Sequence, residues 1–281
     1  MICRKGDGPV HLPWLGPIFD KAQNKFDSGR HRAGLSPRAH EPQSTIHALH
    51  MRRLLDAIEI ETGKNPSAGV IWMHGLGADG GDFVPIVDEL GLAAAPGLRF
   101  VFPHAPMRPV TINGGAVMRA WYDVSFGDLE GKSRRTDEQG VRESQAQINA
   151  LIEREGKRGV AASRIVIAGF SQGGAVALQT GLRHPQKLAG VMALSAYLPL
   201  ADSLPQEAAA ANQRTSIFMA HGLYDPLVPL MMGAGSKTFL AALGYSIEWH
   251  QYPMPHSVCP QEIADIGAWL RKILNARQGE A

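Results

Sequence analysis

The stretch Gly169-Phe170-Ser171-Gln172-Gly173 decides how the chain folds and where its chemistry lies. It follows an apolar run at residues 165–168 and precedes a helix-compatible run at residues 175–179, which is the context of a nucleophile elbow. Such a turn strains the backbone of Ser171 and brings strand and helix together, so positions 169 and 173 must lack a Cβ atom. Because the chain holds 31 glycines, chance can also produce this pentapeptide, and an ordinary serine in a Gly-rich loop stays the alternative.

Composition and charge restrict the class of protein. A chain of 281 residues with 44% hydrophobic residues can bury a sizeable core, and we expect one α/β domain over residues 51–281. Lys and Arg outnumber Asp and Glu by seven to four in residues 1–50, but the balance is 21 to 22 in residues 51–281. This nearly neutral body argues against a nucleic-acid binder or a dedicated binder of acidic membranes.

The cysteines and the hydropathy pattern indicate a compartment. Cys3 and Cys259 lie at opposite ends of the sequence, which is neither a disulfide framework nor the spacing of a metal site. No apolar run has the length of a signal peptide or of a membrane span. We therefore expect a cytoplasmic protein with no metal, no cofactor and no stable membrane insertion.

Residues 1–50 differ in character from the rest of the chain. Prolines at positions 9, 13, 17, 37 and 42 break any periodic pattern, so little stable structure is expected there. Two readings stay open. These residues form a loose extension, or the start is mis-assigned and the biological product begins at Met51, where an ordered element begins.

From about residue 68, short apolar runs alternate with longer helical patterns, which predicts a mostly parallel sheet with helices on both faces. One helix is expected to begin at Thr136, with Gln139 at the reciprocal capping position. Further helices are expected after Ser171, over residues 230–243 and over residues 260–274. The expected strands are residues 69–73, 98–102, 164–168, 190–194, 215–220 and 246–252.

A serine hydroxyl needs a base to take its proton and an acid to hold that base, and in this fold both follow the serine at strand ends. Asp225 follows the run at residues 215–220, at the edge of the sheet where ligands bind. Asp202 also follows a strand and is the rival acid. His256 follows the last strand and is the predicted base, whereas His250 lies inside that strand and is expected to pack against the sheet.

Attack on an acyl carbonyl also requires two donors for the oxyanion. The backbone amide of Gln172 is the first, and the amide of Leu76 in the loop His74-Gly75-Leu76-Gly77 is the expected second. His74 itself is interpreted as structural.

The same loop offers a competing motif, since Gly75-x-Gly77-x-x-Gly80 follows a strand, as a dinucleotide-binding fingerprint would. Two observations count against nucleotide binding. No acid ends the next strand, and Asp79 and Asp82 would repel a pyrophosphate. A metal site made of His74, Asp79 and Asp82 is weaker still, because no further ligand stands at matching spacing.

Six motifs in a fixed order carry a family resemblance over about residues 65–275. They are His74-Gly75-Leu76-Gly77-Ala78-Asp79-Gly80, Pro109-Val110-Thr111-Ile112-Asn113-Gly114-Gly115, Trp121-Tyr122-Asp123, residues 169–174, His221-Gly222 with Asp225, and Met254-Pro255-His256-Ser257-Val258. The chain resembles the phospholipase/carboxylesterase family, which includes the acyl-protein thioesterases, and the resemblance is close to its bacterial carboxylesterase branch. Arg119 stands where the thioesterase branch usually carries proline, and Pro255 where many relatives carry glycine.

The resemblance implies an α/β-hydrolase fold without a large lid domain, with Ser171, Asp225 and His256 as the catalytic triad. The expected function is hydrolysis of carboxylic esters or thioesters of acyl substrates, by a monomer or a homodimer. A non-catalytic hydrolase-fold binding protein is the alternative from a different class. The expected wall of the acyl site, whose members could equally be core side chains, consists of Met107, Ile112, Trp121, Leu227 and Val228.

Overall fold

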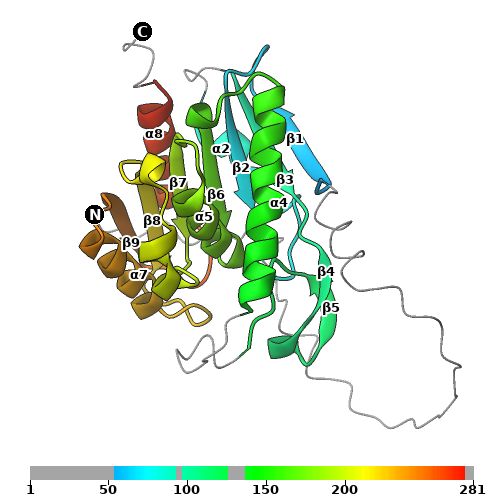
Figure 1. The fold of residues 1–281 in the computed structure, drawn as a ribbon, viewed down its shortest axis with the longest axis vertical. Coiled ribbons are helices and arrows are strands. Elements are labelled where there is room, and N and C mark those ends of the chain that lie inside the picture. The colour runs from blue at the N-terminus through cyan, green and yellow to red at the C-terminus, as the bar shows by residue number, and fades with distance from the viewer. Residues whose placement is uncertain (1–53, 93–96, 126–136, 276–281) are drawn as a thin grey trace, which may run out of the picture.

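The computed structural model describes residues 54–92, 97–125 and 137–275. A seven-stranded sheet forms its centre, with strand order β1-β3-β2-β6-β7-β8-β9 (Figure 1). All neighbouring strands are parallel except β1, which pairs antiparallel with β3. The strands are β1 Ala57–Glu61, β2 Ala68–Met73, β3 Leu98–Pro103, β6 Ile165–Phe170, β7 Gly190–Leu194, β8 Ser216–Gly222 and β9 Ile247–Tyr252.

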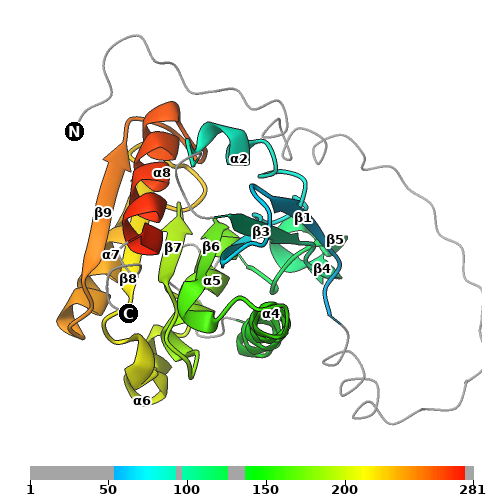
Figure 2. The same cartoon turned by 90° about the horizontal axis from the view of Figure 1, so that it is seen from above.

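Helices cover both faces of the sheet, which confirms the predicted α/β-hydrolase architecture. Figure 2 shows α2 and α8 on one face and α4 on the other. The buried side chains divide in the same way into two clusters, one beneath α2 and α8 and one beneath α4, α5 and α7. Strands β2, β3, β6 and β7 are buried at every position, because helices cover them on both sides. The helices are α2 Ile86–Glu89, α4 Glu138–Lys157, α5 Gln172–Arg183, α6 Leu204–Glu207, α7 Leu230–Ala242 and α8 Pro260–Asn275.

Helix α4 begins later than the sequence motif indicated. Asp137, one residue after Thr136, is its N-cap and accepts a hydrogen bond from the Gly140 backbone, and the expected pairing of Thr136 with Gln139 stays a prediction. Thr136 itself lies outside the described residues, as do residues 1–50, so the predictions for that extension stay untested. Val141, Ile148 and Leu151 of this helix are all buried.

Two elements were not expected from the sequence. Strand β1 adds an antiparallel edge to the sheet. Strands β4 (Met107–Val110) and β5 (Ala116–Arg119) form a separate antiparallel hairpin joined by the short helical turn Thr111–Asn113, which lies beyond the end of the main sheet (Figure 1). This hairpin leads directly into the Trp121-Tyr122-Asp123 motif.

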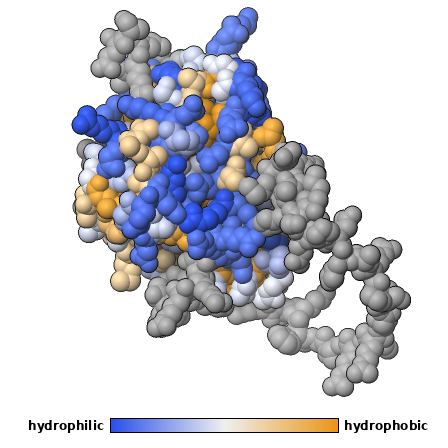
Figure 3. Space-filling view, in the orientation of Figure 1, coloured by the Kyte–Doolittle hydropathy of each residue, from blue (hydrophilic) through white to orange (hydrophobic). Residues whose placement is uncertain are grey.

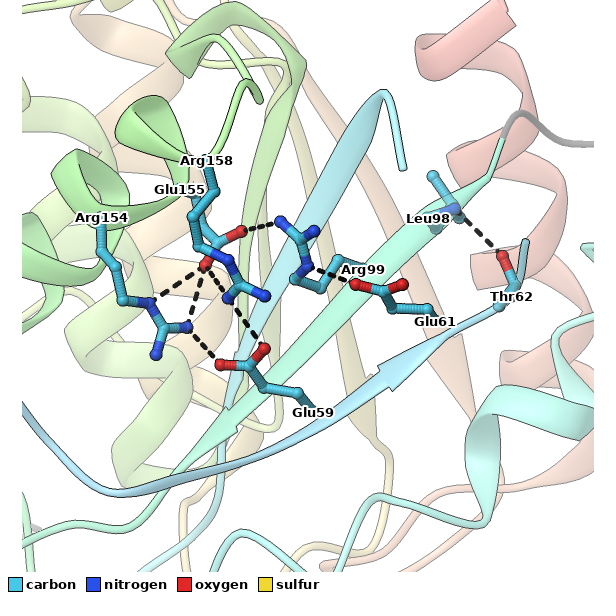
Figure 4. Close-up of polar contacts among 8 residues, drawn as sticks. All are labelled: Glu59, Glu61, Thr62, Leu98, Arg99, Arg154, Glu155 and Arg158. Atoms are coloured by element: carbon cyan, nitrogen blue, oxygen red, sulfur yellow. Dashed lines mark hydrogen bonds and ion pairs between the residues drawn. The ribbon is translucent and has the colours of Figure 1, made fainter. Parts of the chain in front are cut away.

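An ion-pair network fastens β1 to the rest of the fold (Figure 4). Arg99 on β3 donates to Glu61 at 2.8 Å and to Glu155 of α4 at 2.7 Å. Glu155 has a side chain that is only 1% exposed, and it also pairs with Arg154 and Arg158. Both of these arginines bind Glu59 of β1. A buried carboxylate is therefore matched by three cations, and the edge strand is tied to α4.

The described surface is mixed in character. On the face seen in Figure 3, hydrophilic residues cover most of the surface and hydrophobic residues form small separate groups. Among the helices in residues 54–92, 97–125 and 137–275, none is long and apolar enough to cross a bilayer.

Candidate active site

Ser171 occupies a sharp turn between the last residue of β6 and the first residue of α5. Its φ of 54° and ψ of −121° lie in a region that residues with a side chain rarely adopt. A Cβ atom at position 169 would lie 2.3 Å from the Gly173 backbone, and one at position 173 would lie 2.4 Å from the Met73 carbonyl oxygen. Both glycines are therefore required by close backbone contacts, as the elbow motif predicted.

His256 and Asp225 meet beside this turn. The His256 Nδ1 donates to Asp225 Oδ2 at 2.7 Å, and Asp225 Oδ1 accepts from the backbone amides of Leu227 and Val228 at 2.9 Å. Burial opposes the carboxylate charge, but the hydrogen bond and charge of His256 and the two amides together hold the pKa of Asp225 below its ordinary value. With Nδ1 donating, Nε2 of the neutral ring is free to accept a proton.

The rival acid does not take part in this pair. Asp202 is exposed in the short helical turn Ala201–Ser203, whereas the carboxylate that contacts His256 is that of Asp225. His250 stacks on Phe218 within the strand layer at a centroid distance of 4.9 Å, as its place inside β9 indicated.

Two contacts place the imidazole of His256 at the elbow. Its ring lies 4.6 Å, between centroids, from the ring of Phe170, the residue that precedes Ser171. A Cβ atom at Gly222 would lie 2.4 Å from the Pro255 carbonyl oxygen, so the end of β8 packs tightly against the loop that carries His256. The structure therefore brings Ser171, His256 and Asp225 to one edge of the sheet, in the order expected from the sequence.

The loop after β2 supplies backbone amides next to the elbow. Gly77 N donates to Arg119 O at 2.9 Å, whereas the amide of Leu76 donates no hydrogen bond within the described residues. Gln172 is the first residue of α5, where a backbone N–H has no acceptor within the helix. The close contact of Gly173 with the end of β2 brings these two segments together. Neither amide therefore has an acceptor among the described residues, and both lie in segments next to the elbow.

His74 is a structural residue at the base of this loop. It is buried, its Nδ1 donates to Gly75 O at 2.7 Å, and its Nε2 accepts from Ala105 N at 3.0 Å. Burial lowers the pKa of His74 to about 4, which keeps the ring neutral, and its two hydrogen bonds fix the tautomer.

The alternative readings of the loop find no support in its contacts. The amide of Gly80 donates to His104 Nδ1, and a Cβ atom at Gly80 would lie 2.3 Å from Phe102 O, so this glycine packs on β3 rather than facing a phosphate. Asp79 accepts from the Gly81 backbone, as expected for a turn residue. Within the described part of the chain, no group of three or more His, Cys, Asp or Glu side chains could hold a metal ion.

The five expected wall residues occupy different environments. Met107 on β4 is 58% exposed and Leu227, two residues after Asp225, is 37% exposed, so both offer apolar surface to solvent. Ile112 is partly buried and packs against the core. Trp121 and Val228 are buried at 0% and 5% exposure, and they support the site from behind rather than forming an open wall.

Two polar side chains at the site were missed by sequence reasoning. His221 is fully buried, and its Nε2 donates to Val228 O at 2.9 Å, which fixes the turn whose amides hold Asp225. The side chain of Gln172 bonds to the backbone of Trp121 and Tyr122. Gln172 was expected to act through its backbone alone, and His221 lies four residues before Asp225, but the side-chain partners of both are set only by the fold.

Comparison with known proteins shows the family of this chain. The model of the phospholipase/carboxylesterase family matches residues 55–274. Acyl-protein thioesterase 1 of Cryptococcus neoformans is 36% identical over 234 residues, covering 78% of this chain and 98% of that protein. Its counterpart from Neurospora crassa is 40% identical over 216 residues, covering 74% and 87%.

A solved structure gives the same result. Arabidopsis thaliana SOBER1 is 30% identical with a TM-score of 0.67, and the match covers 74% of this chain and 99% of that one. The two curated relatives are fungal thioesterases, whereas the sequence motifs had pointed to a bacterial carboxylesterase branch. The coarser assignment holds: the chain belongs to the phospholipase/carboxylesterase family of α/β-hydrolases and is acyl-protein thioesterase-like.

Proposed function

We propose that this chain hydrolyses acyl esters or thioesters with Ser171 as nucleophile, His256 as base and Asp225 as the acid that orients the base. The observation that carries the proposal is the 2.7 Å hydrogen bond from His256 to the buried Asp225, beside a serine held in an elbow conformation. His256 Nε2 takes the hydroxyl proton while Ser171 Oγ attacks the acyl carbonyl. The protonated imidazole then returns the proton to the leaving alcohol or thiol, and water repeats the attack on the acyl-enzyme.

The negative charge that develops on the acyl oxygen needs two preorganised donors. Leu76 N and Gln172 N are the proposed donors, because one has no partner within the described residues and the other begins a helix. The positive end of the α5 dipole adds to this stabilisation. In this proposal, groups of the chain itself stabilise the negative charge that forms on the acyl oxygen.

The substrate is proposed to be an apolar acyl chain on a thioester or ester. The names of the fungal relatives support a thioester, and exposed Met107 and Leu227 supply apolar surface for the acyl group. The bacterial carboxylesterase branch, with simple esters as substrates, is supported by the motifs alone. Arg119, where thioesterases usually carry proline, favours this second substrate class.

Steady-state kinetics on p-nitrophenyl esters of two to twelve carbons, on a matched acyl-thioester and on a lysophospholipid would test the proposal. Ser171→Ala is expected to abolish turnover of every substrate. Ser195→Ala is the matched control, because Ser195 follows the neighbouring strand β7 with a similar φ of 47° but is buried, and its hydroxyl has no hydrogen-bond partner among the described residues. A folded wild type without turnover of any of these would support the binding-protein alternative instead.

A further inference from the structure

The side chain of Gln172 is buried and both of its polar atoms are hydrogen-bonded, although only its backbone has a role in the proposed reaction. It is 5% exposed, its Oε1 accepts from Trp121 N at 2.8 Å, and its Nε2 donates to Tyr122 O at 2.7 Å. These two partners lie about fifty residues earlier in the chain. A buried amide costs about 1–3 kcal/mol when a partner is lost, so this pair of bonds holds the Trp121–Tyr122 segment against the elbow.

Trp121 in turn holds the loop that carries the other oxyanion donor. Its side chain has no exposed surface, and its indole Nε1 donates to His74 O at 2.9 Å. The imidazole of His74 also contacts the indole ring at a centroid distance of 5.3 Å. On the opposite side, Ser144 of α4 donates its hydroxyl to Trp121 O. Trp121 is therefore fixed through its backbone and its ring. Its bond to His74 in turn fixes the start of the loop that carries Leu76.

These contacts close a ring between the two donors. One side of the ring is the direct backbone contact of Gly173 with the end of β2. The other side runs from the Gln172 side chain through Trp121 to His74, two residues before Leu76. Two independent connections determine both the distance and the angle between two groups, whereas one alone leaves the loop free to tilt.

We propose that the Gln172 side chain is a positioning residue that sets the spacing of the two oxyanion donors through Trp121. The inference rests on the proposed function and deepens it. Displacement of a catalytic group by about 1 Å can cost about 100-fold in rate. Loss of the side-chain contacts therefore acts on the transition state and leaves ground-state binding of the acyl chain largely intact.

The test compares Gln172→Met with Gln179→Met. Gln179 lies on the same helix, is also buried and donates to Gln145 Oε1 at 2.9 Å, so its replacement removes a buried amide from α5 without removing a hydrogen bond to Trp121. With the best p-nitrophenyl ester, Gln172→Met is expected to lower kcat about 10-fold to 100-fold with KM within about twofold. Affinity for an acyl trifluoromethyl ketone, whose adduct oxygen occupies the oxyanion site, should fall by the same factor. Gln179→Met should change neither.

A double-variant cycle tests the path through Trp121. Trp121→Phe removes the indole donor to His74, and the double variant with Gln172→Met should be no slower than the slower single variant, because both break one connection. Multiplicative effects would show that the two side chains act separately and would overturn the inference. So would a folded Gln172→Met with wild-type kcat, or equal losses in Gln172→Met and Gln179→Met.

Two further arms keep the result decisive. If Gln172→Met does not fold, Gln172→Asn replaces it, since its amide is one methylene too short to reach both backbone partners, and the same kcat and ketone losses are required. Failure of the proposed function looks different: the wild type would be inactive, or Ser171→Ala would remain active. An active wild type with an unaffected Gln172 variant refutes only the inference.

Discussion

Replacing Asp225 by asparagine changes one atom at the centre of the proposed mechanism. The Asp225 side chain has no exposed surface, so water cannot replace a lost partner. Its Oδ1 accepts two backbone amides, from Leu227 and Val228. Asparagine must keep its oxygen toward these amides, which turns its NH2 group toward His256 Nδ1. The histidine then has to accept at Nδ1 and carries its proton on Nε2, facing Ser171.

An imidazole in this tautomer cannot take the serine proton. The expected loss in kcat is about 10⁴-fold, which corresponds to about 5 kcal/mol of transition-state stabilisation. KM should change little, because Asp225 is buried behind His256 and does not reach the acyl group.

Initial rates of p-nitrophenyl butyrate hydrolysis measure this effect, with circular dichroism as the check on folding. Asp202→Asn is the matched control, since Asp202 is the rival acid from the sequence but is exposed and makes no contact with His256. It should keep kcat within about twofold of wild type. The reasoning is refuted if folded Asp225→Asn keeps more than about a tenth of wild-type kcat, or if Asp202→Asn loses as much.

Three other changes have defined outcomes. Gly173→Ala puts a Cβ 2.4 Å from the Met73 carbonyl oxygen. It should lower the free energy of unfolding in urea by about 1–3 kcal/mol and remove most of the activity. Gly235→Ala, whose Cβ would lie in open space, should change neither. Glu155→Ala strips three arginines of a shared buried carboxylate and should lower the free energy of unfolding by about 3 kcal/mol; an unchanged urea midpoint would contradict this. Burial raises the pKa of Glu262 from 4.5 to about 8, so the folded protein keeps a proton that the unfolded chain loses, and stability should fall over that range as pH rises. This group can lower the free energy of unfolding by at most about 1.4 kcal/mol per pH unit, and Glu262→Gln should remove that fall. A stability difference between wild type and Glu262→Gln that is the same at pH 5 and pH 8 would refute the prediction.

The elements with strong local signals were predictable from the sequence. Strand β6 and helix α5 flank the elbow, and their residues are apolar runs whose burial on both sides leaves little ambiguity. Asp225 and His256 could be chosen because parallel strands end at the same edge of the sheet. Asp202 satisfied the same rule, and only the loop conformations in the folded chain show which of the two acids contacts His256.

The rest depends on contacts between distant segments. Strand β1 has only a short pattern of alternating isoleucine and glutamate. Its Glu61 binds Arg99, 38 residues later in the chain, and Arg99 in turn binds Glu155, another 56 residues on. The hairpin of β4 and β5 contains glycines and a proline that mask its strand pattern. The Gln172 side chain carries no sequence signal, because its two partners become neighbours only after folding.

The most direct test of the central claim is to find where a fluorophosphonate probe attaches. The folded protein is labelled, digested and analysed by peptide mass spectrometry. The account predicts a single adduct, on Ser171, that is absent from Ser171→Ala and from heat-unfolded wild type, since labelling needs His256 and the oxyanion donors in place. No adduct on active protein, or an adduct on another serine such as Ser195 or Ser257, would contradict it.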